Sequence, residues 1–228
     1  MIVAIDGTVA SGKSSAARLL AQKLGYVYIN TGLMYRGVAA SCRRSGIATD
    51  NAQAVAFHAK FLRVDLRMFA DGQHVFVNGV DLTGVATAPD IGPDVSNVAD
   101  NKTVREVLVR EQRRLGLEAG NAVLEGRDIQ SVVFPDADIK FFVDADVRER
   151  ARRRLADDQA RDASLTMAEV EEQLRARDER DRTREFGALK RAPDAIDIDS
   201  GQFRSAEETA EHMCAIVRDR LRALNGNQ

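Results

Sequence analysis

Five short apolar segments along the chain each end in a polar residue, and stretches with apolar residues at helical spacing separate them. A short apolar run between turns predicts a buried β-strand. Strands that alternate with helices predict right-handed crossovers and a parallel sheet with helices on both faces. In such a sheet, ligands bind beyond the carboxyl ends of the strands. The predicted strands are residues 2–5, 26–30, 121–125, 137–144 and 195–199, and their polar ends are Asp6, Asn30, Glu125, Asp144 and Asp199.

Helical spacing of apolar residues predicts the segments between and after these strands. Thr31 is expected to cap the second helix, and the fourth helical segment is rich in arginine. The third segment carries its apolar residues on one face without interruption, which predicts one continuous helix. The predicted helices cover residues 15–24, 33–42, about 90–117, much of 148–189, and about 206–224.

Between about residues 61 and 83 the helical spacing gives way to alternation of polar and apolar residues. Arg63–Met68 and His74–Val77 are predicted strands, and Asp71-Gly72 and Asn78-Gly79 are typical hairpin turns. We therefore expect a small antiparallel sheet inserted into one α/β domain. The expected division is a core at about 1–60, 90–147 and 190–228, an inserted lobe at about 61–88, and a helical lid at about 148–189.

Composition and charge are those of a globular protein with no polyanion partner. The chain has 228 residues, 44% hydrophobic content and a net charge of −2, so neither nucleic acid nor a membrane surface is an expected partner. Because no apolar run approaches ~20 residues and no signal peptide is apparent, the cytoplasm is the expected location. Cys42 and Cys214 are expected to be buried, reduced thiols, and the three histidines lack metal-ligand spacing. Without a dedicated dimerisation segment, we expect a monomer.

The segment from Gly7 to Ser15 has the composition of a phosphate-binding loop between a strand and a helix. Gly7 and Gly12 let the intervening amides, from Thr8, Val9, Ala10 and Ser11, converge on an anion. Lys13 would reach the outer phosphates, and the Ser14 hydroxyl would bind the Mg²⁺ that accompanies a nucleotide. The pattern Gly-x4-Gly-Lys-Ser is typical of a P-loop, although an ordinary glycine-rich turn is the alternative. We therefore expect a P-loop NTPase-type fold that binds a nucleotide, although the loop alone does not choose between a kinase, a GTPase and an ATP-driven machine.

Two shorter motifs place arginine near strand ends. Thr31 to Arg36 includes Tyr35 and starts a helix; taken alone, it also fits a capped helix with a core tyrosine. Gly126-Arg127-Asp128 follows a buried strand, where packing alone does not readily explain a charged pair; a solvated loop pair is the alternative.

The remaining motifs distinguish among classes of nucleotide-binding protein. Asp81–Gly84 and Asn101–Val104 imitate GTPase motifs, but their positions in a hairpin and a helix argue against a GTPase. Leu124-Glu125 and Val143-Asp144 only weakly imitate the magnesium-binding strand of ATPases. Several arginines near the sheet edge favour phosphoryl transfer between two phosphorylated substrates, because such catalysis depends on positioning and charge neutralisation. These arginines are Arg36, Arg127, Arg177, Arg180, Arg182 and Arg184.

Taken in order, these motifs resemble those of the bacterial cytidylate kinases, over almost the whole chain. The matching segments are Ile5–Ser14, Thr31–Arg36, Gly126–Asp128, Val132–Ala137 and Arg177–Arg184. The chain departs from the usual pattern at Asn30, where aspartate is common, and at Gln130, where glycine is common. If the second position required a positive φ, glutamine would be strained there.

The resemblance implies a role for each matching residue. Arg36, Arg127, Arg177 and Arg184 would hold the acceptor phosphate, with Lys13 and the last three forming the catalytic group. Asp181 would accept from the ribose, and Ser96, Arg105 and Asp128 would read the cytosine. Thr31 and Tyr35 would also contact CMP. Arg150–Arg161 would belong to the lid over ATP, with Arg153 or Arg154 touching its phosphates.

The resemblance implies magnesium-dependent transfer of the γ-phosphoryl group of ATP to CMP or dCMP, in pyrimidine nucleotide metabolism. The acceptor phosphate is already an anion, so no protein nucleophile or dedicated general base is expected. Two other interpretations remain at this point. One is a kinase of the same fold that acts on a neutral hydroxyl, and the other is a nucleotide-binding regulatory protein that has lost catalysis.

Overall fold

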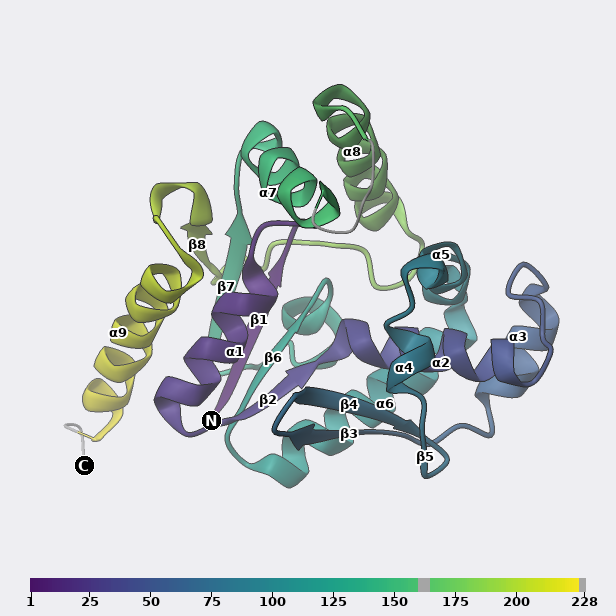
Figure 1. Cartoon of the computed structure of the whole chain (residues 1–228). Coiled ribbons are helices and arrows are strands. Elements are labelled where there is room, and N and C mark those ends of the chain that lie inside the picture. The colour runs from purple at the N-terminus through teal and green to yellow at the C-terminus, as the bar shows by residue number, and fades with distance from the viewer. Residues whose placement is uncertain (160–164, 226–228) are drawn as a thin grey trace. The chain divides into compact units, whose positions relative to one another are not determined.

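A parallel five-stranded sheet carries the polar strand ends predicted from the sequence (Figure 1). The computed structural model of the chain describes residues 1–159 and 165–225. The sheet has the order β2-β6-β1-β7-β8, and β1 pairs in parallel with both of its neighbours. The predicted fold class is therefore confirmed. The strands are β1 (Ile2–Gly7), β2 (Val27–Asn30), β6 (Ala122–Gly126), β7 (Ile139–Asp144) and β8 (Ile196–Asp199).

The register of the sheet brings the carboxyl ends of its central strands to one edge. Asp6 pairs with Gly126 of β6 and with Phe142 of β7, and Asp144 pairs with Asp199 of β8. The loops that follow β1, β6 and β7 therefore begin side by side. This edge is where an open α/β sheet holds its ligands.

One face of this sheet is covered by α1 and α9, which lie side by side in Figure 1. Leu20 of α1 and Met213 of α9 are fully buried with Val3, Ile5 and Phe141 of the strands. The apolar core thus fixes the helix that starts at the phosphate-binding loop. The helices of this part of the chain are α1 (Lys13–Leu24), the π-helical turn η2 (Ile129–Val133), α7 (Val147–Gln159), α8 (Met167–Thr183), the 3-10 turn η3 (Ser200–Gln202) and α9 (Ala206–Asn225).

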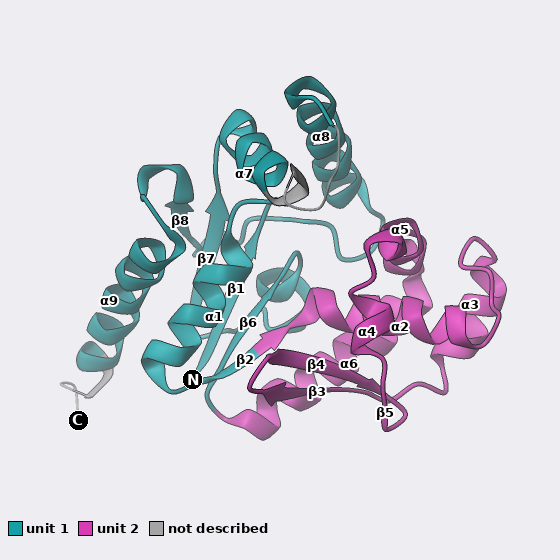
Figure 2. Cartoon of the chain, in the orientation of Figure 1, with its two compact units in different colours: residues 1–28, 121–228 teal, residues 29–120 magenta. Residues whose placement is uncertain are grey.

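The chain divides into two compact units, residues 1–28 with 121–228 and residues 29–120 (Figure 2). The second unit contains the predicted antiparallel sheet, to which the structure adds a short third strand. Its strands are β3 (Val64–Phe69), β4 (Gly72–Val77) and β5 (Val80–Asp81). Its helices are α2 (Thr31–Arg44), α3 (Ala52–Ala59), α4 (Thr83–Ala86), the 3-10 turn η1 (Pro89–Ile91), α5 (Gly92–Asp100) and α6 (Lys102–Ala119).

This second unit is larger than the inserted segment 61–88, because the sheet shares its core with the helices around it. Val64, Val75 and Val77 are buried in one cluster with residues of α2, α3, α5 and α6. At Gly37 of α2, an added Cβ would clash with the Val75 side chain, so the helix lies directly on β4. The alternating strands therefore pack as part of a unit that begins at the end of β2.

Two helix starts differ from the sequence prediction. The expected helix of residues 90–117 is in fact α5 and α6, because the Asn101 side chain accepts from Val104 N at 3.3 Å and starts a new helix. Leu117 is 72% exposed and does not continue the buried face. The cap of α2 is Asn30, which accepts from Leu33 N at 3.0 Å, and Thr31 lies inside the first turn. A local side-chain acceptor explains both differences.

Both cysteines are buried, as predicted, and burial raises the pKa of the Cys42 thiol to about 11. Two of the histidines make hydrogen bonds to nearby side chains. His58 forms one with Ser41, and His74 lies between Asp71 and Asp81 and forms hydrogen bonds with both. Within residues 1–159 and 165–225, no helix is long and apolar enough to cross a membrane.

Gln130, which stands where glycine is common in the expected motif, is not strained. In the described part of the chain only Ala10 and Asn78 combine a side chain with a positive φ. The Gln130 side chain is 1% exposed; its amide group donates to Phe141 O at 3.2 Å and accepts from Ala192 N at 2.9 Å. It therefore links η2 to β7 and to the segment before β8.

We expect Gln130→Leu to lower the free energy of unfolding by about 1–4 kcal/mol, because it leaves the buried Ala192 N–H unpaired and removes the hydrogen bond to Phe141 O. Equilibrium unfolding in denaturant measures the change. Gln22→Leu, on the exposed face of α1, is the matched control and should change stability by less than about 0.5 kcal/mol. Equal stability of the two variants would contradict the bridging role of Gln130.

Candidate phosphate-binding site

The loop between β1 and α1 has the backbone shape that its glycines predict. At Gly7, an added Cβ would overlap the Val143 carbonyl oxygen of β7, so only glycine fits where the loop leaves the sheet. Gly12, at φ 77°, precedes α1 in the left-handed conformation, and Ala10 shares that conformation at φ 59°. Two left-handed residues around Ser11 fold the loop back onto the start of the helix, where backbone amides can surround an anion.

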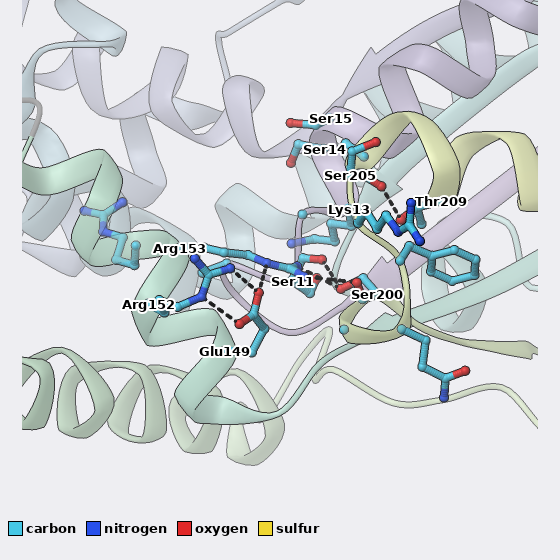
Figure 3. A pocket seen from close by; sticks show the side chains of 18 residues that line it. Ser11, Lys13, Ser14, Ser15, Glu149, Arg152, Arg153, Ser200, Ser205 and Thr209 are labelled. Carbon is cyan, nitrogen blue, oxygen red and sulfur yellow. Dashed lines mark hydrogen bonds and ion pairs between the residues drawn. The ribbon is translucent and has the colours of Figure 1, made fainter.

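Side chains of the loop stabilise its conformation through hydrogen bonds. Ser11 Oγ and Lys13 Nζ donate to the Thr8 carbonyl at 3.0 and 3.1 Å. The Thr8 hydroxyl donates to Asp144 Oδ1 at the end of β7, at 2.5 Å. A pocket of about 730 Å³ opens above the loop (Figure 3). Its lining comes from residues 10–15 of the loop, Glu149 and 152–154 of α7, and 200–206 with Thr209 before and within α9.

Lys13 is buried, and its charge is only partly compensated. Burial is the main cause that lowers the pKa of Lys13, to about 7, and the Arg127 guanidinium lowers it further. Glu125, Asp181 and Asp6 act in the opposite direction. A phosphate group beside the ammonium would add the negative charge that this position lacks.

Ser14 lies beside a buried carboxylate. Its hydroxyl donates to Glu125 Oε1 at 2.9 Å, and the Tyr28 hydroxyl donates to the same oxygen at 3.5 Å. Hydroxyl and carboxylate oxygens are the ligands that Mg²⁺ prefers in proteins, so these residues fit the expected ion. Nearby, Asp6 accepts from the backbone N–H groups of Ile129 and Gln130, yet burial raises its pKa to about 7.

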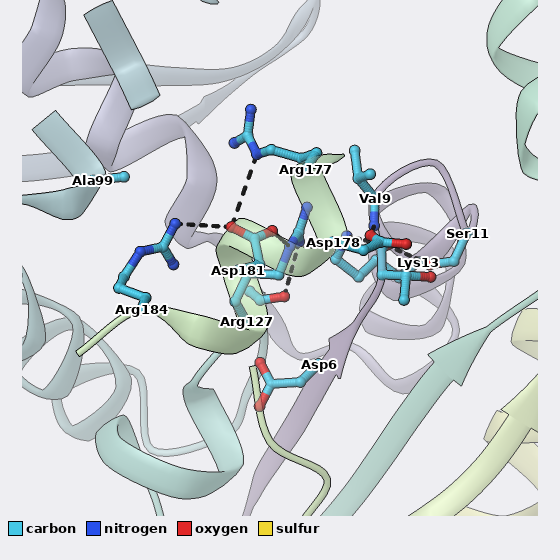
Figure 4. A network of polar contacts seen from close by, with 12 residues as sticks. Asp6, Val9, Ser11, Lys13, Ala99, Arg127, Arg177, Asp178, Asp181 and Arg184 are labelled. Atoms are coloured by element: carbon cyan, nitrogen blue, oxygen red, sulfur yellow. Dashed lines mark hydrogen bonds and ion pairs between the residues drawn. The ribbon is translucent and has the colours of Figure 1, made fainter. Parts of the chain in front are cut away.

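Three arginines of the predicted acceptor site meet at one carboxylate (Figure 4). Asp181 accepts from Arg127 Nε at 2.9 Å and from Arg184 at 2.8 Å, and Arg177 Nε lies 3.8 Å from it. Burial alone would raise the pKa of Asp181, but these guanidinium groups lower it. Guanidinium groups outnumber the carboxylate by three to one among these four side chains, a composition suited to binding an anion. Arg180 and Arg182 are instead exposed on α8.

Most of the other predicted acceptor residues lie in the second unit, on α2, α5 and α6. Arg105 is buried, stacks over the Tyr35 ring at 5.1 Å and donates to Ala99 O at 3.0 Å. Arg36 donates to Ala86 O at 3.1 Å, and the Ser96 hydroxyl donates to Gly92 O at 3.3 Å. Stacking on Tyr35 thus fixes the orientation of the Arg105 guanidinium group.

Thr31 is buried at the start of α2, in the second unit. Asp128 is also buried but lies in the first unit, just before η2. The base-reading roles of Ser96, Arg105 and Asp128 stay predictions.

Of the two arginines predicted to touch the ATP phosphates, Arg153 links α7 to the segment before α9. It donates to Glu149 Oε1 at 2.8 Å, to Ser200 Oγ at 3.1 Å and to Ser200 O at 3.0 Å. Ser200 in turn donates to Ser11 O at 2.7 Å, which links α7 to the loop. Arg153 and Arg154 both line the pocket. Arg161 lies outside the described residues.

Sequence reasoning missed three residues that contact the loop or its helix. Glu125 was noted as a polar strand end and as a weak imitation of a magnesium-binding strand, but its contact with the Ser14 hydroxyl was not predicted. Arg150 and Asp178 form an ion pair that reaches the backbone of Val9. Asp178 belongs to the Arg177–Arg184 motif, which was a usable signal. Nothing in the spacing separates Arg150 from the other arginines of α7.

The parallel sheet, the loop and the arginine cluster define a P-loop α/β protein that holds phosphate groups. The cytidylate kinase family model matches residues 3–219. A cytidylate kinase of Geobacter sulfurreducens is 44% identical over 99% of this chain and 96% of its own length. Cytidylate kinases of Geobacillus sp. and Thermotoga sp. are 39% and 41% identical, each over 96% of this chain and 97% of their own. The chain belongs to the cytidylate kinase family, and the resemblance seen in its motifs is confirmed.

The lowered pKa of Lys13 predicts that nucleotide binding takes up a proton. At pH 8, a lysine of pKa about 7 is about 0.9 neutral, and phosphate beside it favours the charged form, so the pKa rises on binding. Titration calorimetry of Mg-ADP binding at pH 8, in buffers of different ionisation enthalpy, should show uptake approaching one proton. The uptake should be small at pH 6, where Lys13 is already charged. Lys13→Met should abolish it, and uptake that persists in this variant would contradict the assignment.

Proposed function

We propose that the chain transfers the γ-phosphoryl group of Mg-ATP to CMP or dCMP, giving ADP and CDP or dCDP. The observation that carries this proposal is the proximity of two anion sites in one compact unit. The pKa of Lys13 in the loop responds to both Arg127 and Asp181 of the arginine cluster. Family membership supplies the nucleotide substrates, since its relatives are named cytidylate kinases.

On the donor side, the loop amides and Lys13 would hold the phosphate chain of ATP. Ser14 and Glu125 would hold Mg²⁺, which supplies positive charge to the phosphate oxygens when bound. Arg153 and Arg154 line the same pocket and would face the nucleotide. The internal bonds of Ser11 and Thr8 keep the loop in shape before ATP arrives, so little reorganisation accompanies binding.

On the acceptor side, Arg127, Arg177, Arg184 and Arg36 would hold the monophosphate in line with the donor. Asp181 keeps the first three guanidinium groups together, and one of its oxygens would also accept from the ribose. Because the attacking oxygen belongs to a phosphate anion, the protein needs only to position it and neutralise charge.

The base would be read by Ser96, Arg105 and Asp128, with Thr31 and Tyr35 beside the nucleotide. A carboxylate and a hydroxyl can accept from the cytosine amino group, which uracil lacks. Movement of the segment 61–88 and of the lid at 148–189 would exclude water, which otherwise competes as the acceptor. We further infer a monomer located in the cytoplasm.

Release of ADP from Mg-ATP with CMP, dCMP, UMP, AMP, GMP or no acceptor tests the proposal. We expect CMP and dCMP to support the fastest release, and Lys13→Ala to slow it by orders of magnitude in a folded protein. Equal release without any acceptor would indicate an ATPase. Binding of ATP without release under any condition would indicate a regulatory nucleotide-binding protein.

The base-reading role of Asp128 gives a second prediction. Asp128→Ala should lower kcat/KM for CMP by about 10–100-fold, because the cytosine amino group loses a charged acceptor. It should lower kcat/KM for UMP by less than about threefold. Asp136→Ala, at an exposed position of the same loop region, is the control and should change neither. Equal losses for CMP and UMP would reject this role.

A further inference from the structure

A buried ion pair lies against the outer side of the phosphate-binding loop. Arg150 of α7 and Asp178 of α8 approach to 2.7 Å, and their side chains are only 6% and 3% exposed. Burying two charges is costly unless each makes further hydrogen bonds. Both do, and the partner they share is the backbone of Val9.

Both the N–H and the C=O of Val9 form hydrogen bonds with this ion pair. Its N–H donates to Asp178 Oδ1 at 3.4 Å, and its carbonyl accepts from Arg150 Nη1 at 3.1 Å. Figure 4 shows Val9 and Asp178 beside Lys13 and Ser11. Arg150 is itself fixed to the end of β7, where Nε donates to Ala145 O at 2.9 Å. The guanidinium group thus ties the loop to β7 and α8 together.

Apolar packing supports the same arrangement. Val9 and Ala10 pack against a small cluster formed by Ala151 of α7 with Val170 and Leu174 of α8. The loop is therefore fixed from outside by both helices, whereas its other side faces the pocket, which Ala10 helps to line.

The carbonyl contact determines where the next amide points. The Val9–Ala10 peptide is trans, so its C=O and N–H point in opposite directions. Because Val9 O points to Arg150, Ala10 N–H points away from it. Ala10 has a left-handed conformation that is uncommon for a residue with a side chain, so contacts around the peptide must hold it in this orientation.

We propose that Arg150 and Asp178 are positioning residues that orient the Val9–Ala10 peptide so that Ala10 N–H serves the donor phosphate chain. This role rests on the proposed phosphoryl transfer, in which such preorganised donors act most strongly in the transition state. Asp178 also lies between Arg177 and Asp181 on α8, so the helix that contacts the donor loop also carries two members of the acceptor cluster.

The test compares Arg150→Lys, Arg150→Met, Asp178→Asn and the double variant Arg150→Met with Asp178→Leu. The double variant removes both charges and fills their volume, so no buried charge is left without a partner, and this variant should melt at a higher temperature than Arg150→Met does. We expect it and Asp178→Asn to lower kcat by at least about tenfold, with KM for CMP within about threefold. Arg150→Lys should recover part of the rate lost in Arg150→Met.

Arg175→Met provides the matched control, because Arg175 pairs with Glu171 at 3.1 Å on the exposed side of α8. It should keep the wild-type kcat. A double variant that recovers both melting temperature and kcat would show that the pair is only structural, and would overturn the proposal.

A second readout does not depend on transfer. In ¹H–¹⁵N spectra, the Ala10 amide should shift on addition of Mg-ADP in the wild type and in Arg175→Met, and should shift much less in the double variant. The positioning role is overturned if Mg-ADP leaves the chemical shift of the wild-type Ala10 amide unchanged. It is also overturned if Mg-ADP changes this shift equally in all the proteins. Failure of the wild type to phosphorylate any monophosphate overturns the proposed function instead, whatever the Ala10 amide does.

Discussion

The close approach of Gly7 to the carbonyl of Val143 is the constraint on which the site depends. β1 lies in the middle of the sheet, and its last residue leaves no room for a side chain against β7. The loop must therefore leave the sheet directly beside the end of β7, where Thr8 reaches Asp144. From there the chain turns back through two left-handed residues into α1, whose apolar side is fixed in the core by Leu20. The positions of Lys13 and Ser14 follow from that path.

Burial of charge is the second organising feature of this unit. Lys13, Arg150, Asp178 and Asp181 are all buried, and each lies beside an opposite charge or a backbone group that compensates it. Isolated charges in such positions would be costly, whereas paired and hydrogen-bonded charges hold a defined geometry. Burial lowers the pKa of Lys13 to about 7 at the place where the proposed donor phosphate would sit.

The sequence predicted the sheet and the loop well, because both are local patterns. Apolar runs with polar ends locate the strands to within two residues, and the glycine spacing locates the loop. The break between α5 and α6 was missed because the apolar periodicity continues across it, and only Asn101, as a possible cap, marks the new helix. The contacts of Arg150 could not be predicted, since they join residues far apart in the chain. Gln130 shows the reverse case, in which an apparent conflict disappears once its two backbone partners are known.

The charge of the arginine cluster bears on the class of acceptor. Arg127, Arg177 and Arg184 surround the single carboxylate of Asp181, in positions already fixed by hydrogen bonds and ion pairs. A phosphate monoester carries about −1.5 to −2 at pH 7, so a monophosphate would bring negative charge to the cluster. A neutral hydroxyl acceptor would offer these guanidinium groups no negative charge. The cluster therefore favours a nucleoside monophosphate over a small neutral alcohol, independently of how the base is read.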